Sequence, residues 1–163
     1  MLALDVRRLN KKYPNFQLKD VSFQLEQGYI MGFIGANGAG KTTTLKSILN
    51  MIRADSGEVR IMGKNIAEHE LELKQEIGFA FGGTDFYTRS KLKTLTGVIK
   101  KFYANWDDAA YSGYLRRFKL DENKKISELS TGMKVKYSVA LALSHGAKVL
   151  ILDEPTSGLD PVA

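Results

Sequence analysis

The chain alternates between short apolar runs and polar or glycine-rich breaks, and the spacing of the apolar positions changes along its length. Residues 2–9 and 16–25 alternate imperfectly between apolar and polar side chains, which predicts two antiparallel strands. Residues 29–34 form a nearly continuous apolar run, the pattern of a strand buried on both faces of a parallel sheet. Three later apolar runs predict further strands, at residues 58–62, 77–81 and 148–152.

Other segments carry apolar residues at helical spacing. Apolar side chains at positions 45, 48, 49 and 52 predict a helix over residues 41–51, and a shorter helix is predicted at 68–74. Beyond Gly83 three amphipathic helices are predicted, at residues 91–104, 107–118 and 131–144. We therefore expect an α/β fold with a parallel-sheet core, an N-terminal antiparallel β subdomain and a helical subdomain inserted at about residues 85–145.

A complete phosphate-binding loop, Gly35-Ala36-Asn37-Gly38-Ala39-Gly40-Lys41-Thr42, stands between the predicted strand at 29–34 and the next helix. Glycines let backbone N–H groups turn inward around the β- and γ-phosphates, and the following helix points its positive end at the same charge. Lys41 adds a point charge, and the Thr42 hydroxyl is placed to ligate Mg²⁺. The predicted nucleotide-binding residues of this segment are Gly35, Asn37, Gly38, Ala39, Gly40, Lys41, Thr42 and Thr43.

An acidic pair, Asp153 and Glu154, directly follows the apolar run at 148–152. A strand end beside a phosphate loop can hold one carboxylate toward Mg²⁺, and we predict that role for Asp153. Glu154 lies one position further on and can polarise a water in line with the γ-phosphate, so we assign hydrolysis to it. The loop and the acidic pair, in this order, predict a protein that binds a nucleoside triphosphate with Mg²⁺ and hydrolyses it.

Composition narrows the possible partners. The chain has no cysteine and only two well-separated histidines, which argues against disulfide and zinc chemistry. The formal charge is +6, but basic residues occur along the whole sequence, so we favour an ordinary solvated face over a dedicated polyanion surface and expect no nucleic-acid partner. Because no apolar run approaches the roughly 20 residues of a membrane span, a cytoplasmic location is expected.

Two further segments indicate which class of nucleotide-hydrolysing protein this is. Leu129-Ser130-Thr131-Gly132-Met133 opens a predicted helix, and Ser157-Gly158-Leu159-Asp160 follows the acidic pair. The chain resembles the ATP-binding-cassette (ABC) family, whose signature sequence, Walker B strand and D-loop occupy these places. Together with residues 102–107, the signature is similar to that of single-domain ATPase subunits of bacterial exporters related to bacitracin-resistance transporters. The resemblance implies one P-loop NTPase domain of RecA-like type over residues 1–163.

The resemblance also implies roles for individual residues. Two subunits of this family sandwich two ATP molecules, so Ser130, Thr131 and Gly132 are expected to face the nucleotide of a second subunit. Tyr13 matches the aromatic residue that stacks on adenine, and Asp160 matches the D-loop aspartate at the dimer seam. Purely structural alternatives are a helix cap for Ser130 and a tyrosine packed on the sheet for Tyr13.

The chain departs from the family pattern in three places. Where most relatives carry a glutamine, residues 82–85 read Gly-Gly-Thr-Asp, so either Thr84 or Asp85 takes over its metal and water contact or the contact is absent. Thr131 and Met133 replace the usual glycine and glutamine of the signature. The family's switch histidine lies beyond Ala163, so we expect a C-terminally incomplete domain that binds ATP and Mg²⁺ but hydrolyses ATP weakly.

These features together predict the ATP-hydrolysing energy subunit of a bacterial exporter, peripheral on the inner face of the membrane. Its expected partners are a second nucleotide-binding subunit, identical or different, and an integral membrane permease that selects the substrate and is implied by the resemblance alone. A soluble ABC-type ATPase associated with translation or DNA is the alternative. The compact insert lacks sustained heptads, which argues against chromosome and repair ATPases, whereas a translation factor stays open.

Overall fold

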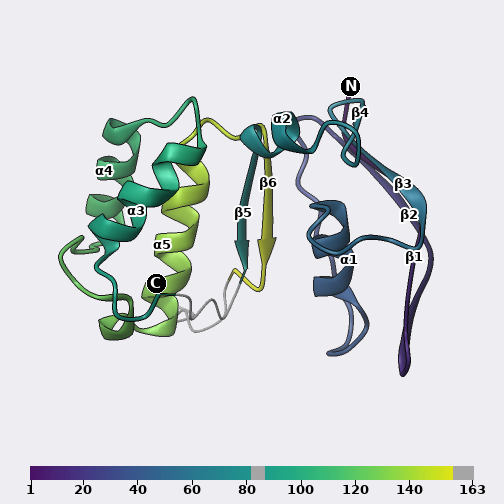
Figure 1. Ribbon diagram of the computed structural model, residues 1–163, viewed down its shortest axis with the longest axis horizontal. Coiled ribbons are helices and arrows are strands. Elements are labelled where there is room, and N and C mark those ends of the chain that lie inside the picture. Colours follow the sequence, from purple (N-terminus) through teal and green to yellow (C-terminus); the bar gives the residue numbers. More distant parts are fainter. Residues whose placement is uncertain (82–86, 156–163) are drawn as a thin grey trace. The chain divides into compact units, whose positions relative to one another are not determined.

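The computed structural model describes residues 1–81 and 87–155, and the chain divides into two compact units, Met1–Lys74 and Gln75–Ala163. The first unit is built on a four-stranded antiparallel sheet with the strand order β2-β1-β3-β4 (Figure 1). The strands are β1 (Leu2–Tyr13), β2 (Phe16–Glu26), β3 (Ser56–Ile61) and β4 (Lys64–Asn65). This confirms the predicted antiparallel strands, although β1 and β2 are longer than expected because bulges carry their pairing past Val6 and Leu9.

Two helices complete the first unit. Helix α1 (Lys41–Ile48) begins at the phosphate loop, and α2 (Glu70–Gln75) follows the short hairpin of β3 and β4. The core is apolar and contains fully buried side chains from β1, α1 and β3, namely Val6, Leu9, Ile48, Leu49 and Ile61. Burial of these side chains is the main force that holds α1 in the first unit.

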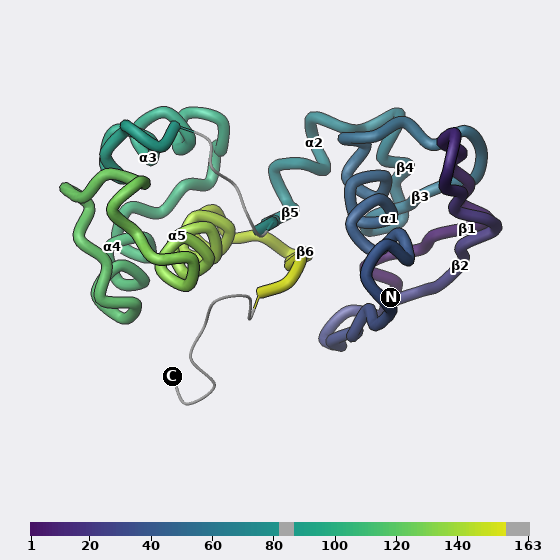
Figure 2. The backbone as a smooth tube through the Cα atoms, turned by 90° about the horizontal axis from the view of Figure 1, so that it is seen from below, coloured from purple at the N-terminus to yellow at the C-terminus, as the bar shows by residue number. Residues whose placement is uncertain are grey.

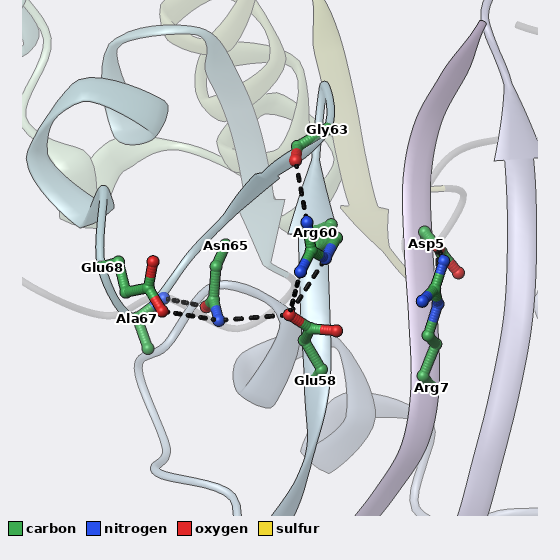
Figure 3. A network of polar contacts seen from close by, with 8 residues as sticks. All are labelled: Asp5, Arg7, Glu58, Arg60, Gly63, Asn65, Ala67 and Glu68. Atoms are coloured by element: carbon green, nitrogen blue, oxygen red, sulfur yellow. Dashed lines mark hydrogen bonds and ion pairs between the residues drawn. The ribbon is translucent and has the colours of Figure 1, made fainter.

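Charged side chains alternate in sign on β1 and β3 (Figure 3). Arg7 pairs with Asp5 at 2.6 Å, and Arg60 pairs with Glu58 at 2.7 Å. The strand register also sets Asp5 opposite Arg60 and Arg7 opposite Glu58, so every neighbour on this face has the opposite charge. The hydrogen bond from Arg7 lowers the pKa of Asp5. A slip of two residues would set Asp5 opposite Glu58 or Arg7 opposite Arg60, so this pattern helps to specify the register.

The prediction of a buried strand at residues 29–34 was wrong. The backbone there forms no strand, and Tyr29, Ile30 and Ile34 are 70%, 101% and 96% exposed. An apolar run predicts that a segment will be buried, but a strand also needs neighbours for its backbone N–H and C=O groups. Within residues 1–81 and 87–155 no strand pairs with this segment.

The second unit contains a parallel strand pair, β5 (Ile77–Phe81) and β6 (Val149–Asp153), which confirms both predictions. Helix α5 (Thr131–Leu143) packs against β5. A Cβ atom on Gly78 would lie 2.5 Å from the Ala142 carbonyl oxygen and 3.1 Å from the Ala147 Cβ. Glycine at this position therefore allows the helix to approach the strand closely.

Helices α3 (Leu92–Ile99) and α4 (Asp108–Arg117) lie beside α5 (Figures 1 and 2). The prediction of one helix over residues 91–104 was too long, because α3 tightens into a 3₁₀ turn at Lys100–Phe102 and the chain is then extended at Tyr103. Asp107 caps α4 by accepting hydrogen bonds from the N–H groups of Ala109 and Ala110. The helices enclose a common core of Leu92, Tyr111, Leu115, Leu120, Ile126, Leu129 and Tyr137. No helix in the part of the chain that the structure describes is long and apolar enough to span a bilayer.

Candidate functional site

The phosphate loop adopts a conformation that two of its glycines make possible. Gly38 and Gly40 have φ angles of 81° and 95°, in the left-handed region that other residues rarely adopt. A Cβ atom on Gly40 would lie only 2.5 Å from side-chain carbons of both Phe16 and Leu18 on β2. The end of the loop therefore lies tightly against the sheet, and only glycine fits there.

Lys41 folds back over this loop. Its Nζ donates hydrogen bonds to the carbonyl oxygens of Gly35 at 2.6 Å and Ala36 at 3.0 Å. Helix α1 begins at the same point, with Gly40 as its N-cap and without a side-chain cap. An ammonium group and a helix N-terminus thus meet at one place, and both favour a bound anion. Gly40 and Lys41 therefore fit a triphosphate.

Tyr13 is separated from the phosphate loop by the ring of Phe16. It stands opposite Phe16 across the β1–β2 hairpin, and the two ring centroids are 6.4 Å apart. Phe16 in turn contacts Gly40. The Tyr13 ring is 38% exposed, and the Lys11 Nζ lies 5.6 Å from its centroid. The structure therefore leaves the Tyr13 side chain partly exposed, one ring away from Gly40 of the phosphate loop.

The acidic pair lies at the C-terminal end of β6. Asp153 is the last residue of this strand, is half-buried and pairs with Phe81 in the ladder. Glu154 is exposed and has a φ angle of 50°, which is rare for a residue with a side chain. Backbone strain of this kind is common where a functional side chain must point in a particular direction.

The signature residues form the N-terminus of α5. The Ser130 Oγ accepts a hydrogen bond from the Met133 N–H at 3.2 Å, so Ser130 caps the helix, the structural role considered for it from the sequence. Thr131 and Gly132 occupy the first two helical positions, where N–H groups have no partner within the helix. The N-terminal end of α5 lies at the same end of the second unit as the C-terminal end of β6 (Figure 1). The structure thus brings the signature and the acidic pair to one edge of this unit.

Two sets of predicted residues lie outside the described residues. These are Asp160, the expected D-loop aspartate, and Gly82 to Asp85, where a glutamine was expected from the family pattern. Sequence reasoning also missed Phe16 and Leu18 as the floor of the phosphate loop. The only available signal was Gly40 itself, because a loop glycine directly before a helix often marks a close approach of backbone to side chain.

The second unit also contains an apolar groove of about 780 Å³ that the sequence reasoning missed. It lies between β5, α3 and α5, and its apolar lining includes Phe79, Phe81, Val98, Phe102 and Leu141. Phe102 is 70% exposed and Val98 is 52% exposed. The four-residue spacing of Thr94, Val98 and Phe102, which all line the groove, was the available signal.

Comparison with known proteins decides the family. The sequence profile of the family described as "ABC transporter" matches residues 18–157, which is most of the chain. The chain belongs to the ABC transporter family. In this ABC protein the strands, helices and phosphate loop described above therefore form the ATP-binding domain, and the fold is that of a P-loop NTPase, as the resemblance implied.

Three relatives illustrate the similarity. The ABC chain is 37% identical over 160 residues to the ABC transporter ATP-binding protein YtrB of Bacillus subtilis (strain 168), covering 98% of this chain and 54% of YtrB. It is 36% identical to the bacitracin transport ATP-binding protein BcrA of Bacillus licheniformis, covering 94% of this chain and 51% of BcrA. A solved ATP-binding subunit of an ABC transporter is 28% identical with a TM-score of 0.85, covering 99% of this chain and 70% of that one. The ABC chain thus spans about half the length of these two curated relatives.

Proposed function

We propose that the chain binds ATP with Mg²⁺ and belongs to the ATP-hydrolysing energy subunit of a bacterial exporter. The observation that carries this proposal is the phosphate loop, in which Lys41 and the start of α1 meet at Gly40, a position with no room for a side chain. The family match supports ATP as the anion. Similarity to a bacitracin transport protein supports a role in export.

In the proposed site, electrostatic attraction and hydrogen bonds hold the phosphates. The backbone N–H groups of residues 35–43 bind the β- and γ-phosphates, and Lys41 turns from the loop carbonyls to the phosphate oxygens. Thr42 and Asp153 are the residues that would hold Mg²⁺, because a hydroxyl and a carboxylate are oxygen ligands of the kind this ion prefers. When bound, the ion neutralises charge that develops on the transferred phosphoryl group. Tyr13 stacks on the adenine ring.

Glu154 is the proposed catalytic residue. Its carboxylate is exposed and follows directly after the strand that holds Asp153, so it can accept a hydrogen bond from a water molecule placed in line with the γ-phosphate. The left-handed backbone at Glu154 supports this role, because it directs the side chain away from the path of the strand.

A second subunit completes the site. The free N–H groups at Thr131 and Gly132, with the cap at Ser130, form an anion site at the start of α5. In the proposed dimer these groups close over the γ-phosphate that is held by the phosphate loop of the partner, and Asp160 crosses the seam. ATP then joins the subunits, and hydrolysis removes the charge that holds them together.

We further propose that an integral membrane permease binds the subunit and holds it at the inner face of the membrane. The groove beside α3 supports this partner, because it is apolar and lined by the exposed Phe102 and Val98. Phe102→Glu should reduce co-purification with a co-expressed permease, whereas Leu71→Glu, at an exposed apolar residue of the first unit, should not. Capture of ribosomes in place of the permease would favour a translation ATPase.

Calorimetry with ATP and Mg²⁺ tests the first step. Wild-type protein should bind with measurable heat, and Lys41→Ala should weaken binding at least about tenfold, since a charge-assisted contact contributes ~1.5–3 kcal/mol. Lys46→Ala is the matched control, because it removes a lysine from the last turn of the same helix. Equal affinity of the wild type and Lys41→Ala would reject the proposed phosphate site.

Light scattering tests the dimer. Glu154→Gln keeps the shape of the side chain but removes the base, so ATP should accumulate and the variant should double in mass with ATP but not with ADP. Adding Ser130→Arg to this variant should abolish the dimer without weakening ATP binding by each subunit. A Glu154→Gln protein that binds ATP and stays monomeric would contradict the sandwich.

A further inference from the structure

The positive charge of the chain is concentrated in one segment. Residues 87–136 contain twelve Lys and Arg and five Asp and Glu, which gives this segment a net charge of +7. The whole chain has a net charge of +6, so the remaining residues together have −1. Nine of the twelve basic residues are lysines. This segment holds twelve of the 24 Lys and Arg of the chain in under a third of its length, so the expectation of basic residues spread along the whole sequence was wrong.

Within this segment four lysines lie on two short stretches of backbone that pair with each other. Lys91 and Lys125 form an isolated antiparallel bridge. Around it, the Leu92 N–H donates to the Lys124 carbonyl oxygen at 3.0 Å, and the Lys93 N–H donates to the Glu122 carbonyl oxygen at 2.9 Å. Lys91, Lys93, Lys124 and Lys125 are called the lysine cluster below.

The lysine cluster is not neutralised within the protein. All four side chains are exposed, and none forms an ion pair within the described residues. Lys11, Lys64, Lys74, Lys100 and Lys148, by contrast, each pair with a carboxylate. Three acidic residues lie close to the lysine cluster in sequence. Asp121 accepts hydrogen bonds from Asn123 in its own turn, and the Glu128 carboxylate accepts one from the backbone N–H of Lys125 at 2.5 Å. Glu122 meets the cluster through its carbonyl oxygen.

The fold keeps this arrangement despite its electrostatic cost. Like charges that face each other across a strand pair repel. The lysine cluster is nevertheless fixed, because Leu92 and Ile126 beside it are 0% and 4% exposed and belong to the helical core. Exposed lysines on a backbone that is held in place raise the local positive potential, which attracts a polyanion.

We propose that the lysine cluster binds the anionic headgroups of a lipid bilayer. The inference rests on the proposed function, which places the protein beside a membrane. Lysines attract an anionic surface as point charges without the paired geometry that arginine offers to single phosphates, which fits the excess of lysine here. Tyr87, the first residue of this segment and four positions before Lys91, is exposed and provides an aromatic side chain of the kind found at membrane interfaces.

Vesicle co-sedimentation with the full chain tests this surface. Vesicles that contain phosphatidylserine should bind the protein, pure phosphatidylcholine vesicles should not, and added salt should weaken binding. The variant K91Q/K93Q/K124Q/K125Q should bind on the order of 100-fold more weakly. The variant K12Q/K19Q/K64Q/K74Q removes the same charge from the first unit and should retain most of the binding.

Three outcomes would overturn the inference: no binding to phosphatidylserine vesicles at low salt, equal losses in the two variants, or tighter binding to duplex DNA than to vesicles. Calorimetry with ATP separates this inference from the proposed function. If both lysine variants bind ATP normally, a failure in the vesicle assay rejects the lipid surface alone. Circular dichroism melting of each variant establishes that the protein is folded.

Discussion

At the scale of single residues, the absence of a side chain at Gly40 allows the phosphate loop to lie against the sheet. Its φ angle of 95° and the carbons of Phe16 and Leu18 leave no room for a Cβ atom. Gly40→Ala should therefore lower the free energy of unfolding by about 1–3 kcal/mol and weaken ATP binding. Urea denaturation measures the first effect and calorimetry the second.

Gly97 provides the matched control for this substitution. It lies inside α3, and a Cβ atom there would meet nothing within 4 Å. Gly97→Ala should raise the stability by about 0.5–1 kcal/mol, because alanine restricts the unfolded chain and favours helix. If both alanine variants change stability in the same direction, the steric explanation for Gly40 is wrong.

His145 is a second residue whose surroundings make a prediction. It is 1% exposed, its ring stacks on Tyr103 at 3.9 Å, and its Nδ1 lies 3.2 Å from the Gln75 carbonyl oxygen. A carbonyl can only accept, so Nδ1 carries the proton, and Nε2 is buried without a partner in the described chain. Burial lowers the pKa of His145, because the charged form has lost its water.

The direction of this pKa shift predicts how stability depends on pH. The unfolded chain binds a proton near pH 6.5, whereas folded His145 takes it up only at lower pH, so stability should fall as the pH drops below about 6.5, by at most ~1.4 kcal/mol per pH unit. His145→Phe keeps a stacked ring and should flatten this dependence in urea denaturation between pH 7 and 5. His69→Gln leaves His145 in place and should leave the slope unchanged. An unaltered slope in His145→Phe would assign it to other groups.

At the scale of helices and strands, a chain of hydroxyl groups joins α3, α4 and α5. The Thr96 Oγ1 lies 2.8 Å from the hydroxyls of both Tyr111 and Tyr137, and the Tyr137 hydroxyl donates to the Leu92 carbonyl oxygen at 3.2 Å. Since each hydroxyl has one proton, Tyr137 must accept from Thr96, and Thr96 must accept from Tyr111. All three side chains are buried, so the direction of every hydrogen bond is determined.

Breaking this chain should destabilise the helical core. Tyr137→Phe leaves the buried Thr96 hydroxyl without its acceptor, and we expect a loss of about 1–2 kcal/mol in urea denaturation. Tyr114→Phe is the control, because Tyr114 is only half-buried and stacks on Phe118 through its ring. Thr96→Val combined with Tyr137→Phe should cost less than the sum of the two single changes. Additive losses would mean that the hydroxyls act independently.

The elements that the sequence predicted well are those whose pattern is local. The spacing of apolar residues identified α5, β5 and β6, and the glycine loop was correctly placed before α1. The strand predicted at residues 29–34 failed because pairing depends on a partner distant in sequence, about which an apolar run says nothing. The 3₁₀ turn after α3 was missed for a related reason, since apolar spacing continues through it although the hydrogen bonding changes.

The sequence predicted the chemical groups of the candidate site but not the apolar residues that hold them in position. Charge and hydrogen-bonding capacity belong to the residue itself. The residue types of the loop, the acidic pair and the Ser130 cap are therefore each enough to suggest a chemical role. The roles of Phe16 beneath Gly40 and of Tyr13 beside Phe16 depend on distances of 2.5 Å and 6.4 Å that arise only from the folded sheet. Sequence reasoning therefore finds reactive groups more readily than the apolar residues that position them.

At the scale of the whole molecule, the uneven charge predicts an unusual response to salt. Residues 87–136 carry +7, and the lysine cluster adds repulsion between four fixed, exposed cations. Salt screens exposed charges over a Debye length of about 10 Å at 0.1 M, so added sodium chloride should raise the melting temperature of the wild type by a few degrees. Differential scanning calorimetry at low and moderate ionic strength measures this change.

The quadruple variant K91Q/K93Q/K124Q/K125Q separates repulsion from a general effect of salt. Because it lacks the opposed lysines, it should melt above the wild type at low salt and gain less when salt is added. The variant K12Q/K19Q/K64Q/K74Q loses the same charge but also two ion pairs, to Glu72 and Glu70, and should melt no higher than the wild type. If salt lowers the melting temperature of the wild type, ion pairs such as that between Arg60 and Glu58 outweigh the repulsion. The lysine cluster would then impose no measurable strain on the fold.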